Sequence, residues 1–391
     1  MRDGGATPED TATDEAAERS GVRFARLRKH RLLTSAAVLA LLAAGTAVPL
    51  VLSDSGEDRP CRRIPAPTRA LAEDPAAATR ALDPGDDLSR YPAVRDLLSH
   101  DGLCGDDAEA LGEVIEAATR APGPGAPHTV AQARAAYAVV AALSWADVPD
   151  GMAPSVARVL ADYVVDEARY LSASSSAALP VASPELAEPD KEGHSRYGRF
   201  LAPGEAHVDF EYHDPVADAE PEPEHLVSEL AGNPEAFAIL YDAERAYFAH
   251  YLERLTREGG DPAARSSATV WPDNDVEDIA QRVGALMQHR AEHTKEGRIP
   301  DLAAFDEAVR RHTRGAYEAA PRQLTTRPPM GDIADRPVSG PLRGDLTDGR
   351  HQLLTVLDAW AEDRGVPEGR AEVMRQIVDD AYLRGVWLRV L

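Results

Sequence analysis

A stretch of 21 residues without a charged side chain, Leu32 to Leu52, constrains this chain more than any other feature of its sequence. As a helix it would extend about 31 Å, close to the ~30 Å hydrocarbon core of a bilayer. Seven leucines and three valines give it the apolar character that favours insertion. The sequence therefore predicts one transmembrane helix over residues 32–52.

The charges beside this segment predict its orientation. Basic residues, among them Arg28, Lys29 and Arg31, precede it, and acidic residues such as Asp54 and Glu57 follow it. By the positive-inside rule, the tail 1–31 stays in the cytoplasm and the rest lies outside. A cleaved signal peptide is the alternative, with small residues before a cut near residue 48. About 31 residues before the apolar core is long for such a leader, which favours an anchor.

Cys61 and Cys104 are the only cysteines, and both follow the apolar segment. An even pair of cysteines in an oxidising compartment predicts one disulfide. The closed loop would contribute about 4 kcal/mol by the chain-entropy estimate. Two unpaired thiols are the alternative, and a metal or redox role is not indicated because CxxC-like spacing is absent.

Charge limits the classes of partner. The formal net charge is −24, and because the first 31 residues hold 7 basic against 6 acidic side chains, the acidic surplus lies in the rest of the chain. Such a surface repels phosphate backbones, so we expect no nucleic-acid partner. A basic envelope protein is the expected partner class, together with the membrane that the anchor enters.

Beyond the membrane segment, apolar residues recur at helical spacing between readable helix starts. Thr129 and Asn233 stand where an N-cap is expected, and Pro154 and Pro234 suit a first helical turn. The pattern predicts a mainly α domain of two helical subdomains, over residues 53–172 and 226–391. Residues 173–225 between them read as a loop region with a β-hairpin, whose strands would be Tyr197–Leu201 and Ala206–Tyr212.

The stretch Val148–Leu171 resembles helical segments of uncharacterised actinobacterial envelope proteins. The resemblance covers a small part of the chain and contains no diagnostic motif. It implies a helical outer domain and assigns no functional residue.

One short motif suggests metal chemistry. His289, Glu292 and His293 match the H-x-x-E-H pattern of inverzincin metallopeptidases. Two histidines four residues apart on a helix can hold one Zn²⁺ while the glutamate activates water, with Glu368 as a candidate third ligand. The alternative is that His289 lies at the edge of an apolar stripe ending at Met287, with Glu292 facing solvent.

A second set of candidate ligands alternates along the predicted strand: His207, Asp209, Glu211 and His213. Alternate residues of a strand share one face, so the four side chains would point the same way and could bind a divalent cation. The alternative is the solvated face of an edge strand, where charges prevent sheet-to-sheet pairing.

Aromatic residues follow the predicted helix after Asn233 at helical spacing, and they read as core, with an exposed groove for a partner as the alternative. We find no Gly-rich phosphate loop, no GxSxG elbow and no EF-hand, and we predict no cofactor. The sequence favours a membrane-anchored, extracytoplasmic interaction or structural protein, not an enzyme. A metal-dependent hydrolase using the H-x-x-E-H motif is the alternative.

Overall fold

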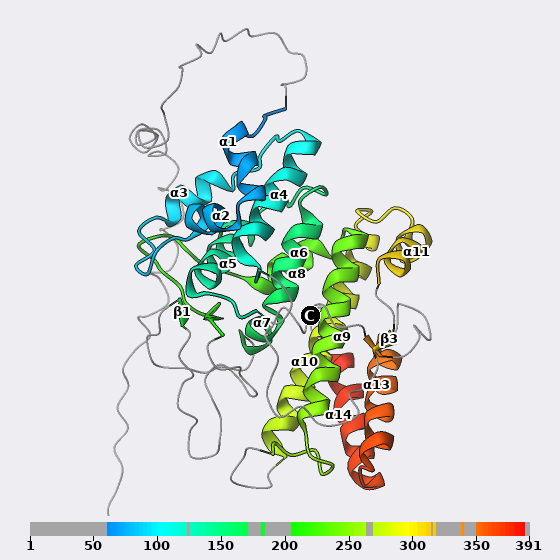
Figure 1. Ribbon diagram of the computed structural model, residues 1–391. Helices are drawn as coiled ribbons and strands as arrows, with labels where there is room; N and C mark the ends of the chain where they lie inside the picture. Colours follow the sequence, from blue (N-terminus) through cyan, green and yellow to red (C-terminus); the bar gives the residue numbers. More distant parts are fainter. Residues whose placement is uncertain are drawn as a thin grey trace, which may run out of the picture. The chain divides into compact units, whose positions relative to one another are not determined.

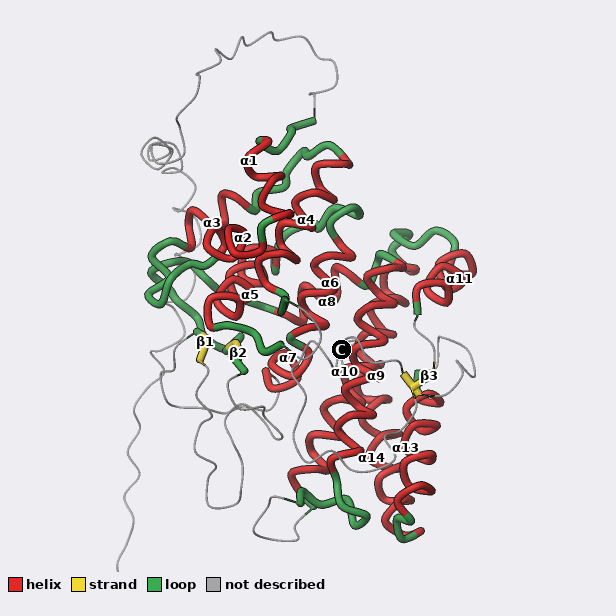
Figure 2. Tube along the Cα trace, viewed as in Figure 1, coloured by secondary structure: helices red, strands yellow, loops and turns green. Residues whose placement is uncertain are grey.

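The part of the chain that the computed structural model describes is mainly helical, which confirms the predicted class (Figures 1 and 2). The described residues are 61–122, 126–170, 181–183, 205–262, 269–313, 316–317, 338–339 and 349–387. They belong to one compact unit, Arg59–Leu391.

The predicted cytoplasmic tail 1–31 and membrane segment 32–52 lie outside the described residues. Within the described ranges, no helix combines the length and the apolar character that a membrane crossing requires. The anchor therefore stays a prediction.

A disulfide fastens the start of the described chain. Cys61 and Cys104 are bonded, with their Cα atoms 4.9 Å apart, which confirms the predicted pairing. Beside it, the Arg62 N–H donates to the Gly102 carbonyl over 2.7 Å, and the Cys104 N–H donates to the Arg62 carbonyl over 3.1 Å. The stretch that follows the predicted anchor is thus tied to the start of the first long helix.

The first half contains most of the short helices together with α4 and α5, and two of its helix starts agree with the sequence. The Thr129 side chain and the Gln132 side chain form a reciprocal capping box at the start of α5. Pro154 lies in the first turn of α6. The elements are α1 (Ala66–Arg69), a 3₁₀ turn (Ala70–Glu73), α2 (Pro75–Leu82), α3 (Tyr91–Leu97), α4 (Gly105–Thr119), α5 (Val130–Leu143), α6 (Ala153–Asp162) and α7 (Val164–Tyr170).

The second half is organised around α9 (Pro234–Arg254), which Asn233 caps by accepting from the N–H groups of Glu235 and Ala236. Its aromatic side chains are buried, which confirms their interpretation as core: Phe237, Tyr241, Tyr247, Phe248 and Tyr251. α9 packs against α6 of the first half and against α10, α11 and α13 of the second. The other helices are α8 (Pro223–Leu230), α10 (Val270–Lys295), α11 (Leu302–His312), α13 (Arg350–Arg364) and α14 (Glu368–Trp387).

α10 and α14 lie side by side and run in the same direction (Figure 1). Arg370 near the start of α14 pairs with Asp273 near the start of α10, and Gly385 near the end of α14 meets Gln281 further along α10. A Cβ added at Gly385 would stand 2.0 Å from the Gln281 carbonyl oxygen, and one at Gly284 would stand 2.2 Å from that of Tyr382. The two backbones therefore touch where each helix has a glycine.

The second strand of the predicted hairpin, Ala206–Tyr212, is much shorter than expected. β2 is only His207–Val208, and it pairs in antiparallel fashion with β1 (Ala182–Ser183); the expected partner Tyr197–Leu201 lies outside the described residues. The strand ends because Asp209 starts a turn: its carboxylate accepts from the Glu211 N–H, and its carbonyl accepts from the Tyr212 N–H. A second short pair, β3 (Ala316–Tyr317) and β4 (Val338–Ser339), is parallel.

The backbone contact of α10 with α14 leads to the first testable prediction. Gly385→Ala should lower the free energy of unfolding by at least about 2 kcal/mol, because the new methyl group must push two helix backbones apart. The matched control is Gly369→Ala in the same helix, where nothing lies within 4 Å of the added Cβ; it should be neutral or slightly stabilising. Urea unfolding of the purified full chain measures both. Equal stabilities for the two variants would contradict the close approach.

Candidate functional site

A buried arginine with two carboxylates lies where α7, α9 and α10 meet. Arg282 of α10 is 8% exposed. Its Nη2 lies 3.0 Å from Oε2 of Glu167 in α7. Its Nε donates over 3.1 Å to Oε1 of Glu244 in α9, and its Nη2 contacts the same oxygen. One guanidinium thus joins carboxylates from both halves of the described chain.

A small cavity adjoins this group. Its volume is about 40 Å³, which is room for roughly three water molecules at ~10–15 Å³ each. The polar lining includes Glu167, Glu244 and Arg282, and apolar walls come from α8, α9 and α10. The Oε2 atom of Glu244 is buried and has no hydrogen-bond partner. The cavity therefore presents acceptors in an otherwise apolar space.

The charges in this cavity are not balanced, because two carboxylates face one guanidinium. Burial, together with the nearby charge of Glu244, raises the pKa of Glu167 to about 7, although Arg282 opposes the change. Burial also lowers the pKa of His289, which lines the same cavity. Near neutral pH, the imidazole is therefore uncharged.

The structure places the H-x-x-E-H motif of α10 beside this cavity. His289 is 1% exposed, and its Nδ1 lies 3.4 Å from Oε2 of Glu292, whose side chain is 37% exposed. His293 is 4% exposed, and its Nε2 lies 2.6 Å from the Ser228 carbonyl oxygen. Both histidines are thus more deeply buried than a place at the edge of the stripe implies. Each ring is oriented by a different partner.

Glu368, the expected third ligand, lies far from these histidines. The start of α14 is beside Asp273, because Arg370 pairs with that residue over 3.1 Å. His289 is sixteen residues further along α10, or about 24 Å at 1.5 Å per residue. The parallel packing of α14 on α10 separates Glu368 from the motif.

The second predicted ligand set does not share a face. His207 is fully buried, and its Nδ1 lies 2.9 Å from Oδ1 of Asp166. Asp209 and Glu211 belong to the turn after β2, so the alternation on which the prediction rested ends at Val208. His213 lies on the surface, away from the strand.

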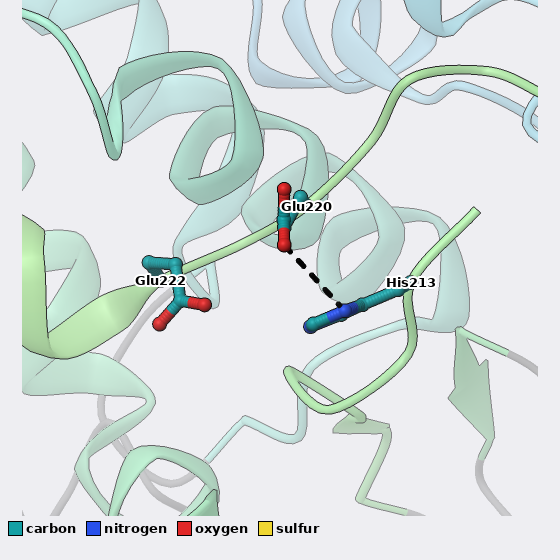
Figure 3. Close-up of side chains that lie close together, drawn as sticks. All are labelled: His213, Glu220 and Glu222. Atoms are coloured by element: carbon teal, nitrogen blue, oxygen red, sulfur yellow. Dashed lines mark ion pairs between the residues drawn. The ribbon is translucent and has the colours of Figure 1, made fainter. Parts of the chain in front are cut away.

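His213 approaches two glutamates instead (Figure 3). One ligand atom each from His213, Glu220 and Glu222 lies within 4.8 Å of the others, the only such group of three in the ranges described here. His213 Nδ1 is 3.9 Å from Glu220 Oε1, and both side chains are about half exposed. A solvated ion pair accounts for this arrangement.

Glu220 belongs to a set of exposed side chains that we call the α5 surface. Its members are Trp145, Val216, Asp218 and Glu220. Trp145, just after α5, is 65% exposed, and Val216 is 95% exposed. The segment 212–222 lies along α5, because the Tyr137 hydroxyl donates to the Tyr212 carbonyl over 2.6 Å, and the Glu222 N–H donates to Ser144 Oγ over 2.8 Å. Val216 lies between Asp214 and Asp218 in the sequence, and Glu222 is bonded to the residue before Trp145.

Another buried histidine lies inside the first half. His128 is 1% exposed, and its Nδ1 is 2.6 Å from Oε1 of Glu205, while Oδ2 of Asp162 lies 3.7 Å from its Nε2. Burial alone would lower the pKa of His128, but the two carboxylates outweigh it and raise the pKa to about 9. Burial would raise the pKa of Asp162, but His128 and Arg120 hold it below its usual value. This is a stabilising ionic cluster within the core.

Of the charged and polar residues around the cavity, the sequence singled out only His289, and not Glu167, Glu244 or Arg282. A signal existed for two of them, since Glu244 falls between Tyr241 and Tyr247 in the aromatic pattern of α9, and Arg282 falls between Ile279 and Val283 in the apolar stripe of α10. A charge inside an apolar stripe predicts a buried partner. Glu167 has no comparable signal.

Comparisons with known proteins assign no family: no protein-family model matches the chain, and no match was found among curated proteins or solved structures.

The His128 cluster generates a prediction on pH. The folded-state pKa of His128 lies above the ordinary value near 6.5, so its stabilisation is full below about 6.5 and is lost as pH rises through about 9. We expect His128→Gln to remove on the order of 3 kcal/mol of unfolding free energy at pH 6, and progressively less toward pH 10.

The control is His351→Gln, which removes an exposed histidine of α13 and should leave the slope unchanged. Urea unfolding of the full chain from pH 6 to pH 10 gives both curves. A His128→Gln curve parallel to that of the unchanged chain would rule out the charged imidazole.

Proposed function

We propose that this chain is a membrane-anchored, extracytoplasmic helical domain that binds a basic protein of the cell envelope at the α5 surface. The observation that carries the proposal is Trp145, an exposed tryptophan that directly follows Ser144, to which the acidic segment 212–222 is bonded. The domain would act by binding and not by catalysis.

The location is supported by the disulfide and by the sequence before it. Both cysteines of the chain are joined, and such bonds persist in oxidising compartments and are rare in the cytosol. The bond begins nine residues after the uncharged segment 32–52, whose basic flank favours a cytoplasmic N-terminus. Together these features favour an outer domain held close to the membrane.

The partner class is supported by the chemistry of the α5 surface. Tryptophan is among the side chains that most often carry binding energy, because a large ring can be buried at a low cost in conformational entropy. The Trp145 ring rests on His225, with ring centroids 4.3 Å apart, so it is held in place while most of it stays exposed.

Charge complementarity specifies the sign of the partner. The side chains of Asp218 and Glu220 are 89% and 61% exposed, although Asp218 pairs with Arg95 over 3.2 Å and Glu220 lies 3.9 Å from His213. The chain as a whole carries a net charge of −24. A basic face would be attracted to such a surface and an acidic one repelled. The attraction would weaken with added salt, because exposed charges are screened.

The location is tested with reporter fusions. A reporter placed before Arg19 should behave as cytoplasmic and one placed after Leu391 as external, because the basic cluster resists translocation. Fractionation of the unfused chain is the companion measurement. Release of a soluble product that begins near Val48 would contradict the anchor.

The binding surface is tested by site-specific photo-crosslinking in the native envelope. A crosslinking amino acid at Trp145 should give a discrete adduct with a protein of basic isoelectric point, and the yield should fall as salt rises. The matched control is Val373, half exposed on α14, which should give no such adduct. Equal yields at the two positions, or an acidic partner, would count against the proposal.

A further inference from the structure

The cavity beside Arg282 has the composition of a ligand site. Its polar groups come from four helices, with Glu167 on α7, Glu224 on α8, Glu244 on α9, and Gln281, Arg282 and His289 on α10. Glu167, Glu244, Arg282 and His289 are at least nine-tenths buried, and Glu224 is partly buried. Glu244 contributes a carboxylate oxygen that no group of the described chain satisfies. A buried acceptor without a donor is costly, on the order of 1–3 kcal/mol, unless something fills the place.

We infer that this cavity binds the ammonium group of a small primary amine. When both are ionised, the buried Glu167 and Glu244 exceed the charge of Arg282 by one negative unit, and the partly buried Glu224 adds to this excess, so a positively charged group is favoured here. An ammonium group carries three donors and no acceptor, which matches the free Oε2 of Glu244. Charge-assisted bonds of this kind are stronger than neutral ones.

Other ligand classes fit less well. An anion would meet two carboxylates, and a neutral alcohol would leave the excess negative charge in place. A metal ion would need several ligand atoms close together, and those of Glu167, Glu244 and His289 do not form such a group among the described residues. The neutral imidazole of His289 supplies a polar atom without adding positive charge.

The walls of the cavity set the size of the amine. Val227, Leu240 and Leu286 give it apolar sides, which favour a short hydrocarbon chain. The space open to water-sized molecules is about 40 Å³, so the ligand is limited to a few non-hydrogen atoms. A linear amine of about three carbons meets both limits, at roughly the volume of the three waters it would displace.

The test uses n-propylammonium with the full chain in detergent at pH 8, followed by ligand-observed NMR and calorimetry. We expect saturable binding at one site per chain. 1-Propanol, which has the same size without the charge, should bind at least roughly tenfold more weakly, a difference of about 1.4 kcal/mol. Comparable binding of 1-propanol would overturn the inference, since an apolar cavity alone would explain it.

Three variants locate the site. Glu244→Gln should weaken propylammonium binding by roughly tenfold or more, and Val227→Phe should abolish it by filling the space while leaving every charge in place. Glu258→Gln removes an equal charge from a side chain that is 63% exposed, and it should bind as the unchanged chain does. Thermal unfolding establishes that each variant is folded.

Each remaining outcome is decisive. Binding that survives both cavity variants would show that the amine only associates with the acidic surface, and it would overturn the inference. Absence of saturable binding to the unchanged chain would do the same. Because the α5 surface plays no part in this experiment, its result is independent of the proposed function.

Discussion

The charge of Arg282 is the constraint on which the rest of this structure depends. A guanidinium taken out of water needs carboxylates at close range, and the desolvation of such a cluster costs several kcal/mol per ion. Glu167 and Glu244 meet that need from α7 and α9. Any arrangement that slid α10 along α9 would leave a buried charge unpaired, so the cluster fixes the register of three helices from both halves.

The glycine contact of α14 depends on the same turn of α10. Gly284 lies two residues after Arg282, and the Gln281 carbonyl beside it meets Gly385. The turn of α10 that carries Arg282 thus also provides the backbone, at Gln281 and Gly284, against which α14 packs. Helices that approach this closely gain dispersion contacts over the whole crossing, and a single Cβ on either side would remove them. The ion pairs of Arg282 and the glycine contact with α14 therefore lie within one turn of α10.

Local signals in the sequence were enough for the helical class, for several helix starts and for the disulfide. Thr129 and Asn233 cap the helices they were expected to cap, and the two cysteines form the predicted bond. These features depend on neighbours in sequence or, for the cysteines, on there being only two. The direction of α14 relative to α10 depends on side-chain fit across more than a hundred residues, and no local pattern encodes it. That direction is what separates Glu368 from His289.

The candidate cavity could not be predicted from the sequence for a related reason. A motif search finds residues that are close along the chain, and it found His289 and Glu292. The carboxylates that line the cavity with His289 come from α7, α8 and α9, which only the fold brings near. Glu244 and Arg282 were visible as charges within apolar stripes, yet a stripe shows that a residue is buried and not which residue it meets. Pairing of buried charges is a tertiary property.

The buried ionisable groups together set how the fold responds to pH. Glu167 and the partly buried Asp278 have pKa values raised to about 7 and about 6, chiefly by burial, and His128 has one raised to about 9. Each of these groups binds its proton more tightly in the folded chain than in the unfolded one, so each makes stability fall as pH rises. The lowered pKa of His289 acts the other way near its ordinary value of 6.5, and the lowered pKa of Asp162 does so only near and below its ordinary value of 3.8. The three raised pKa values favour the fold in mildly acidic solution, and His289 opposes them there. Deprotonation of Glu167 as the pH rises through about 7 increases the negative charge of the cavity, which strengthens its attraction for a cation.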